Sequence, residues 1–144
     1  MTSNKHTHSI HINAPVKKVF YYIEDPAHFI AGMPWESHGT HATVGAVHRT
    51  PEGVVTSYEN KFGEDGKHYV FTREEYVVNE RIVDHSQFGV VFTWTFEPDA
   101  TGTALTFTWD GTKLMKVLDS VLYHVDKDAD RAMATFKREV EALP

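Results

Sequence analysis

The sequence contains no cysteine, which excludes disulfides, zinc–thiolate sites, iron–sulfur clusters and thiol nucleophiles. Basic residues are also few: 14 Lys and Arg stand against 20 Asp and Glu, for a formal net charge of −6. Because phosphate binding depends on clustered cations, we expect no nucleic-acid partner. No apolar run reaches the ~18 residues that a membrane span needs, and the first residues are polar. We therefore expect no membrane insertion and a cytoplasmic location.

Several motifs that carry chemistry are missing too. The chain has no Gly-rich phosphate loop, no dinucleotide-binding Gly pattern and no Gly-x-Ser-x-Gly nucleophile turn. Its ten histidines do not form a metal motif. His6 and His8 share one strand face, and His38 and His41 lie in a loop-like region, but no third ligand stands at an established spacing. We expect no metal and no cofactor.

What is present reads as one domain over residues 1–144, since no repeat, linker or low-complexity tract divides the chain. Residues 6–13 alternate, with Ile10 and Ile12 on one face, and predict a first strand. Asn13 as N-cap and Pro15 in the first turn predict a helix start. Its apolar stripe is Val16, Val19, Phe20 and Ile23. A second short helix is expected from His28 to Met33.

From Trp35 to about Thr112 the pattern has period two, and it predicts six to seven antiparallel strands. The two strands with the most regular alternation contain Phe92, Trp94 and Phe96, and Leu105, Phe107 and Trp109. A loop from Pro98 to Gly102 joins them as a hairpin. Asn79–Arg81 is a second expected turn. On an earlier expected strand, one face carries Val54, Thr56, Tyr58, Asn60 and Phe62. A further expected strand includes Val44 and Val47.

The last thirty residues predict one long helix. Apolar residues recur at intervals of three and four from Leu114 to Leu143, and no Gly or Pro interrupts them before Pro144. At ~1.5 Å per residue, this helix runs about 45 Å. Because its apolar face needs cover along much of that length, we expect a curved sheet to wrap around it.

Three stretches resemble a known superfamily. They are Ile10–Pro26, with its Ala-Pro, Val-Phe and Asp-Pro pairs, the hairpin Thr93–Phe107, and the helix end Phe136–Glu141. Together with the element order, they are similar to the START-like superfamily, also called the polyketide cyclase/dehydrase and lipid transport (SRPBCC) superfamily. The resemblance covers nearly the whole chain. It implies an α+β helix-grip fold, in which a curved antiparallel sheet wraps around a long C-terminal helix, with two short helices after the first strand.

The resemblance and the strand parity together predict an apolar cavity between sheet and helix that binds a small hydrophobic molecule. Large side chains on strand faces would form its sheet wall, helix residues its opposite wall, and residues near the short helices its mouth. The expected ligand-binding residues are Met33, Trp35, Tyr58, Phe71, Phe92, Trp94, Phe107, Trp109, Met115, Leu118 and Leu122. The alternative for any single ring is that it only fills a core.

Polar side chains on inward faces could orient a ligand or act in catalysis. The candidates are Tyr58, Asn60, Arg73 and His85. On residues 67–78 the parity leaves two faces open, one with Phe71 and Arg73 and the other with Thr72 and Tyr76. Of Asp84 and His85, one is expected to face inward. A polyketide cyclase or aromatase using the same cavity is therefore an alternative to a ligand carrier, and a protein-interaction module is a second alternative.

Overall fold

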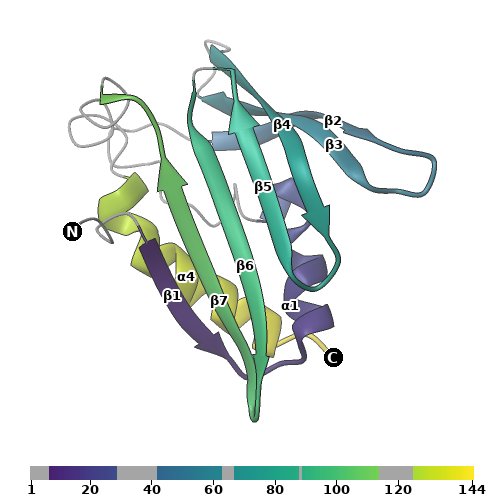
Figure 1. Cartoon of the computed structure of the whole chain (residues 1–144), viewed down its shortest axis with the longest axis vertical. Helices are drawn as coiled ribbons and strands as arrows, with labels where there is room; N and C mark the ends of the chain where they lie inside the picture. Colours follow the sequence, from purple (N-terminus) through teal and green to yellow (C-terminus); the bar gives the residue numbers. More distant parts are fainter. Residues whose placement is uncertain (1–6, 29–41, 63–66, 88, 114–124) are drawn as a thin grey trace.

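A seven-stranded antiparallel sheet dominates the structure, a computed structural model that describes residues 7–28, 42–62, 67–87, 89–113 and 125–144. Its strand order is β1-β7-β6-β5-β4-β3-β2. The strands are β1 (Thr7–Ile12), β2 (Ala42–Arg49), β3 (Val55–Phe62), β4 (Lys67–Val77), β5 (Arg81–Ser86), β6 (Val91–Asp99) and β7 (Gly102–Asp110). Figure 1 shows β2 and β3 running at a large angle to β6 and β7, so the sheet is strongly twisted and curved.

Two helices lie on the same face of this sheet (Figure 1). Helix α1 (Val16–Ile23) packs against β6 and β7, and helix α4 (Val125–Glu141) packs against β1. We call the face that these helices cover the inner face. The expected α+β helix-grip architecture is confirmed. In the described part of the chain, no helix has both the length and the apolar character needed to cross a membrane.

The first helix forms because its apolar residues recur on one side. Val19, Phe20 and Ile23 are fully buried, as the stripe predicts. The predicted N-cap is wrong: Pro15 occupies that position, where its missing N–H costs nothing. The backbone N–H of Asn13 instead donates to the carboxylate of Glu141, 2.8 Å away on α4. Residues 26–28 are helical, and the rest of the expected second short helix lies outside the described residues.

The last helix confirms its predicted stripe over the part that the structure describes. Ala129, Ala132, Phe136 and Val140 are buried against the sheet. Leu143 is an exception: α4 ends at Glu141, so this side chain leaves the stripe and is exposed. Residues 114–124, the first third of the predicted helix, lie outside the described residues.

Three register shifts interrupt the pairing of the described strands, and the first lies between Val44 and Val47 of β2, opposite Asn60 and Tyr58. The other two change which side chains of β3 and β4 face inward. In β3, Arg49 pairs with Val55 while His48 pairs with Ser57, so the register slips by one residue. Val55 is therefore buried and Thr56 exposed, which corrects the predicted face at this end of the strand. In β4, Arg73 pairs with Asp84 and Glu75 with Val83, which leaves one extra residue between them. Such bulges bend a strand and increase its twist.

Two tight turns place the neighbouring strands. Asn79 joins β4 to β5 with φ of 65°, a left-handed conformation that Asn adopts more readily than most residues. Gly102 begins β7 directly against β1, where a Cβ would collide with the carbonyl oxygen of Ile12. Both expected hairpins, at residues 79–81 and 98–102, are confirmed.

Candidate functional site

A continuous row of aromatic rings crosses the inner face. Tyr58 stacks on Phe71 at 5.4 Å between ring centroids, Phe71 on Phe92 at 5.0 Å, and Phe92 meets Phe107 edge-on at 5.3 Å. Phe71 and Phe92 belong to β4 and β6 and meet across β5, where Ser86 lies opposite Phe71 and Asp84 lies opposite Phe92.

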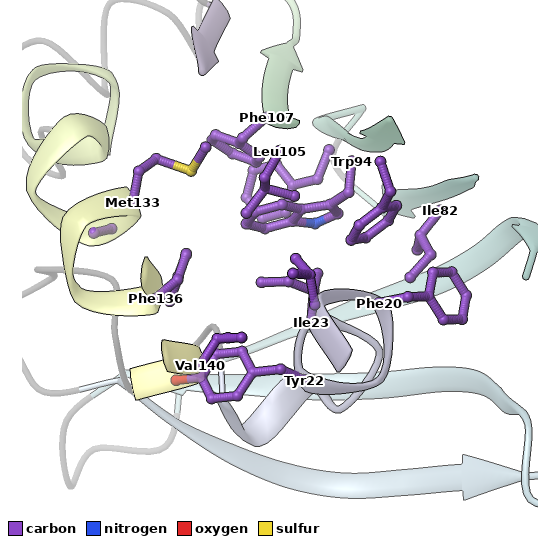
Figure 2. Packing of buried hydrophobic residues seen from close by; sticks show 14 of the residues in the cluster. Phe20, Tyr22, Ile23, Ile82, Trp94, Leu105, Phe107, Met133, Phe136 and Val140 are labelled. Atoms are coloured by element: carbon purple, nitrogen blue, oxygen red, sulfur yellow. The ribbon is translucent and has the colours of Figure 1, made fainter. Parts of the chain in front are cut away.

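At one end of this face the rings meet the helices. Trp94 lies 4.5 Å from Phe107 and 5.9 Å from Phe136 of α4, while Phe20 of α1 lies 5.1 Å from Phe96. Figure 2 shows Trp94 between Ile23, Leu105 and Phe107, with Met133 and Phe136 reaching in from α4. We call this region the helix-packed end; its members are Phe20, Ile23, Trp94, Phe96, Met133 and Phe136. It is an ordinary close-packed core.

The other region of the inner face carries buried polar groups, and we call it the polar end (Tyr58, Asn60, Arg73 and Asp84). Arg73 donates from Nε to Oδ1 of Asp84 at 2.8 Å and from one terminal nitrogen to Oδ2 at 3.0 Å. Its other terminal nitrogen donates to the carbonyl of Glu24 at the end of α1, at 2.9 Å. The Tyr58 hydroxyl donates to Oδ2 of Asp84 at 2.6 Å. The cluster therefore joins β3, β4, β5 and α1.

The electrostatics of this cluster favour one protonation state. Burial raises the pKa of the Tyr58 phenol well above its ordinary value, and the negative charge and hydrogen bond of Asp84 raise it further. Burial acts to lower the pKa of Arg73, but the hydrogen bonds and charge of Asp84 outweigh it, so the pKa of Arg73 is raised. Tyr58 is thus a neutral donor and Arg73 a cation, and both are already directed at Asp84.

Asn60 differs from its neighbours in the cluster. It lies on the same face as Tyr58, two residues along β3, and is 2 % exposed. Its Oδ1 has no hydrogen-bond partner among the described residues. Opposite it on β2 lies Val44, which packs against the core. Buried side-chain polar atoms are nearly always paired, so an unpartnered acceptor at this position needs an explanation.

The structure places the sequence-predicted residues as follows. It brings together on the inner face, all buried, Tyr58, Asn60, Phe71, Arg73, Phe92, Trp94, Phe107 and Trp109. His85 faces the other way, and its Nδ1 lies 3.5 Å from the carboxylate of Glu74, with both side chains about half exposed. Asp84 is the inward member of that pair. Met33, Trp35, Met115, Leu118 and Leu122 lie outside the described residues.

Sequence reasoning undervalued Asp84 and missed Ser86. A usable signal was present, because Ile82, Asp84 and Ser86 alternate along β5 and all three are buried. A carboxylate in phase with a buried isoleucine predicts a buried ion pair. Its partner was already a candidate, since Arg73 stood on one of the two open faces of β4.

A separate groove lies outside the sheet, between α1 and the end of α4. It has a volume of about 840 Å³. Its walls combine lysine stems, aromatic rings and the exposed Leu143, and are formed by Pro15, Lys17, Lys18, Tyr21, Tyr22, His28, Glu139, Ala142 and Leu143. This groove is open to solvent and does not include any predicted site residue.

Two histidines of β1 pair with carboxylates. His8 lies 2.9 Å from Asp130, and His11 lies 3.1 Å from Asp99. Within these ranges, no three His, Asp or Glu side chains gather as a set that could hold a metal ion.

Comparison with known families decides the relationship. The family described as polyketide cyclase / dehydrase and lipid transport matches residues 4–141. The chain belongs to this family. No curated protein matches the chain significantly. Membership of the polyketide cyclase / dehydrase and lipid transport family does not by itself specify a ligand or an activity.

Solved structures share the fold of this family member at low sequence identity. A protein from Arthrobacter aurescens is 15% identical with a TM-score of 0.67, and the match covers 99% of this chain and 91% of that one. The AHSA1-like protein from Aeromonas hydrophila is 19% identical (TM-score 0.59; 94% and 91% covered). The Aha1 dimer from Colwellia psychrerythraea is 14% identical (TM-score 0.63; 94% and 95% covered). At these identities the likeness concerns the fold alone.

Proposed function

We propose that this protein binds a small hydrophobic molecule against the inner face of its sheet, beside the polar end. One observation carries the proposal. At its Tyr58 end the aromatic row lies beside a buried residue, Asn60, whose carboxamide oxygen lacks a partner among the described residues. Ligand pockets typically combine apolar and aromatic walls with a few placed polar groups.

The internal pairing of the cluster favours binding over catalysis. In a cyclase, Tyr58 or Arg73 would donate to an enolate oxygen as negative charge develops on it. Here the phenol donates to Asp84, and the guanidinium donates to Asp84 and to the backbone of α1. Both would have to leave a buried carboxylate to reach a substrate, which costs several kcal/mol. His85 lies on the opposite face of the sheet and is remote from such a reaction.

Native mass spectrometry and calorimetry test the proposal. We expect a ligand of a few hundred daltons to accompany the purified protein, and the ligand-free protein to bind 2-methoxynaphthalene as an apolar probe. Val44→Trp places a large side chain on the inner face opposite Asn60 and should weaken the probe at least about tenfold. Circular dichroism verifies that this variant is folded.

Tyr21→Ala is the matched control for location. Tyr21 is exposed and lines the outer groove, so its removal should leave probe affinity unchanged. If Tyr21→Ala abolishes binding while Val44→Trp does not, the ligand occupies the outer groove and the proposal is wrong. A purified protein that carries no ligand and binds no apolar probe also contradicts it. Turnover of a poly-β-ketone substrate that is lost in Tyr58→Phe would favour the cyclase alternative.

A further inference from the structure

Asn60 indicates what chemistry the ligand brings. The residue is buried and lies next to the aromatic row, because alternate residues of a strand lie about 7 Å apart and Tyr58 is the preceding one on this face. A carboxamide oxygen is an acceptor with two lone pairs, so it requires a donor. Oδ1 has none among the residues that the structure describes.

The side-chain donors of Tyr58 and Arg73 are already used. The Tyr58 hydroxyl donates to Asp84 at 2.6 Å, and Arg73 donates from Nε and both terminal nitrogens to Asp84 and to the Glu24 carbonyl. Val44, opposite Asn60 on β2, has no polar side-chain atom. Neither Tyr58, Arg73 nor Val44 supplies the missing hydrogen bond.

A second asparagine, with a buried side-chain oxygen in a partly exposed residue, shows that an unpaired polar atom is not by itself a site. Oδ1 of Asn79 also has no partner among the described residues. Asn79 stands in the β4–β5 turn with φ of 65°, so its backbone conformation accounts for the residue type. Asn60 lies within β3, where asparagine is disfavoured. Its pairing with β4 is continuous, and a register shift of β2 lies beside it. Its φ is not positive, so the reason that accounts for Asn79 does not apply to Asn60.

We propose that the ligand carries a hydroxyl or N–H group that donates to Oδ1 of Asn60, while its apolar part lies along Tyr58 and Phe71. This inference rests on the proposed function and names the ligand class for the same site: a hydrophobic alcohol, phenol or amine-type N–H compound rather than a pure hydrocarbon, ether or ester. A site built to pair with such a group discriminates against analogues that lack it, because the protein acceptor is then left buried and unpaired.

Two probes that differ in one donor test this assignment. 2-Naphthol and 2-methoxynaphthalene have the same ring system, but only the first can donate a hydrogen bond. We expect wild-type protein to bind the naphthol about three- to tenfold more tightly in calorimetry, the range of one neutral hydrogen bond. In Asn60→Leu the preference should disappear or reverse. This variant should fold, since it replaces an unpaired polar group by an apolar one of similar size.

Asn79→Gly is the control, because Gly accepts the positive φ and removes the other orphan amide. It should keep the wild-type preference. The inference is overturned if wild-type protein binds the two probes equally, which would mean that water alone satisfies Asn60. It is also overturned if Asn60→Leu retains the preference. Both of these results leave the proposed function standing, whereas failure of wild-type protein to bind either probe removes the function and the inference together.

Discussion

The helix-packed end and the polar end share one sheet face, yet their side chains are held in different ways. At the helix-packed end, Trp94 and Phe136 are buried by contact with other apolar side chains. At the polar end, Arg73 and Asp84 are equally inaccessible but are held by directed hydrogen bonds. An apolar core tolerates substitutions by apolar side chains of similar volume. A buried ion pair loses much more stability when one of its two charges is removed. The first arrangement stabilises the fold, and the second fixes positions beside the proposed ligand.

Removing one member of the buried pair should give the largest effect. Asp84→Ala leaves the Arg73 guanidinium buried without its counter-charge, and we expect it to lower the free energy of unfolding by about 3–5 kcal/mol in urea denaturation. The combined variant Tyr58→Phe, Arg73→Met, Asp84→Leu should recover most of this loss, because an apolar trio leaves no orphan charge. If Asp84→Ala is as stable as wild type, the polar end is not held as described.

A cavity at the helix-packed end should cost somewhat less. Met133 is 2 % exposed and reaches from α4 toward Phe107 (Figure 2). We expect Met133→Ala to lower the free energy of unfolding by about 3 kcal/mol, from lost apolar burial and the remaining void. Met133→Leu, nearly equal in volume, is the matched control and should cost less than about 1.5 kcal/mol. Equal losses in both variants would contradict close packing here.

Removing a single hydroxyl from the polar end should lower the free energy of unfolding by a smaller amount. Tyr58→Phe keeps the ring stacked on Phe71 and removes only the donor to Asp84. We expect a loss of about 1.5–2 kcal/mol, since the bond is made to a charged acceptor. An unchanged unfolding free energy would show that this hydrogen bond contributes nothing net.

The same tyrosine makes stability depend on alkaline pH. Its pKa is raised in the folded protein, so the folded state favours the neutral phenol more than the unfolded chain does. That contribution is complete below the ordinary tyrosine pKa near 10 and is lost as the pH rises above it. Tyr22 and Tyr76 also have raised pKa values, so the comparison is between wild type and Tyr58→Phe. Between pH 10 and 12 the free energy of unfolding of Tyr58→Phe should fall less than that of wild type. An equal fall in both proteins would exclude Tyr58 as a cause of the pH dependence.

The smallest effect is expected outside the sheet's inner face. Arg81 and Glu75 form an Arg–carboxylate pair at 2.9 Å between the same two strands as Arg73 and Asp84, but both side chains are about half exposed. Glu75→Gln should therefore change the free energy of unfolding by about 0–1 kcal/mol. This pair is the matched control for burial. A loss comparable to that of Asp84→Ala would show that burial is not what separates the two pairs.

Local periodicity was sufficient to predict much of the fold. The stripe of α1, the alternation of β6 and β7 and the residues Ala129 to Val140 on α4 are buried as expected, because each pattern repeats within one element. Errors occur where the repeat is interrupted: the bulge at Val55 shifts the inward face of β3, and the end of α4 before Leu143 removes that residue from the stripe.

The site was less accessible to sequence reasoning. Tyr58, Arg73 and Asp84 come from three strands, and only the register between them decides that they meet. The sequence does not decide which face of β4 points inward, because both faces carry charged and aromatic residues. Arg73 is buried because Asp84 on β5 and the carbonyl of Glu24, just after α1, accept its hydrogen bonds. Neither residue is near Arg73 in sequence.

The bulge in β4 has a consequence for how this domain can diversify. Phe71 and Arg73 face inward before the extra residue, and Tyr76 faces inward after it, where it meets Phe20 at 5.4 Å. Odd-numbered residues of β4 therefore face inward before the bulge, beside Asp84, and even-numbered residues face inward after it, beside α1. Substitution of Phe71 can alter the inner face beside the proposed ligand while the contact between Tyr76 and Phe20 remains. Loss of the one extra residue at the bulge would instead reverse which side chains face inward on one side of it.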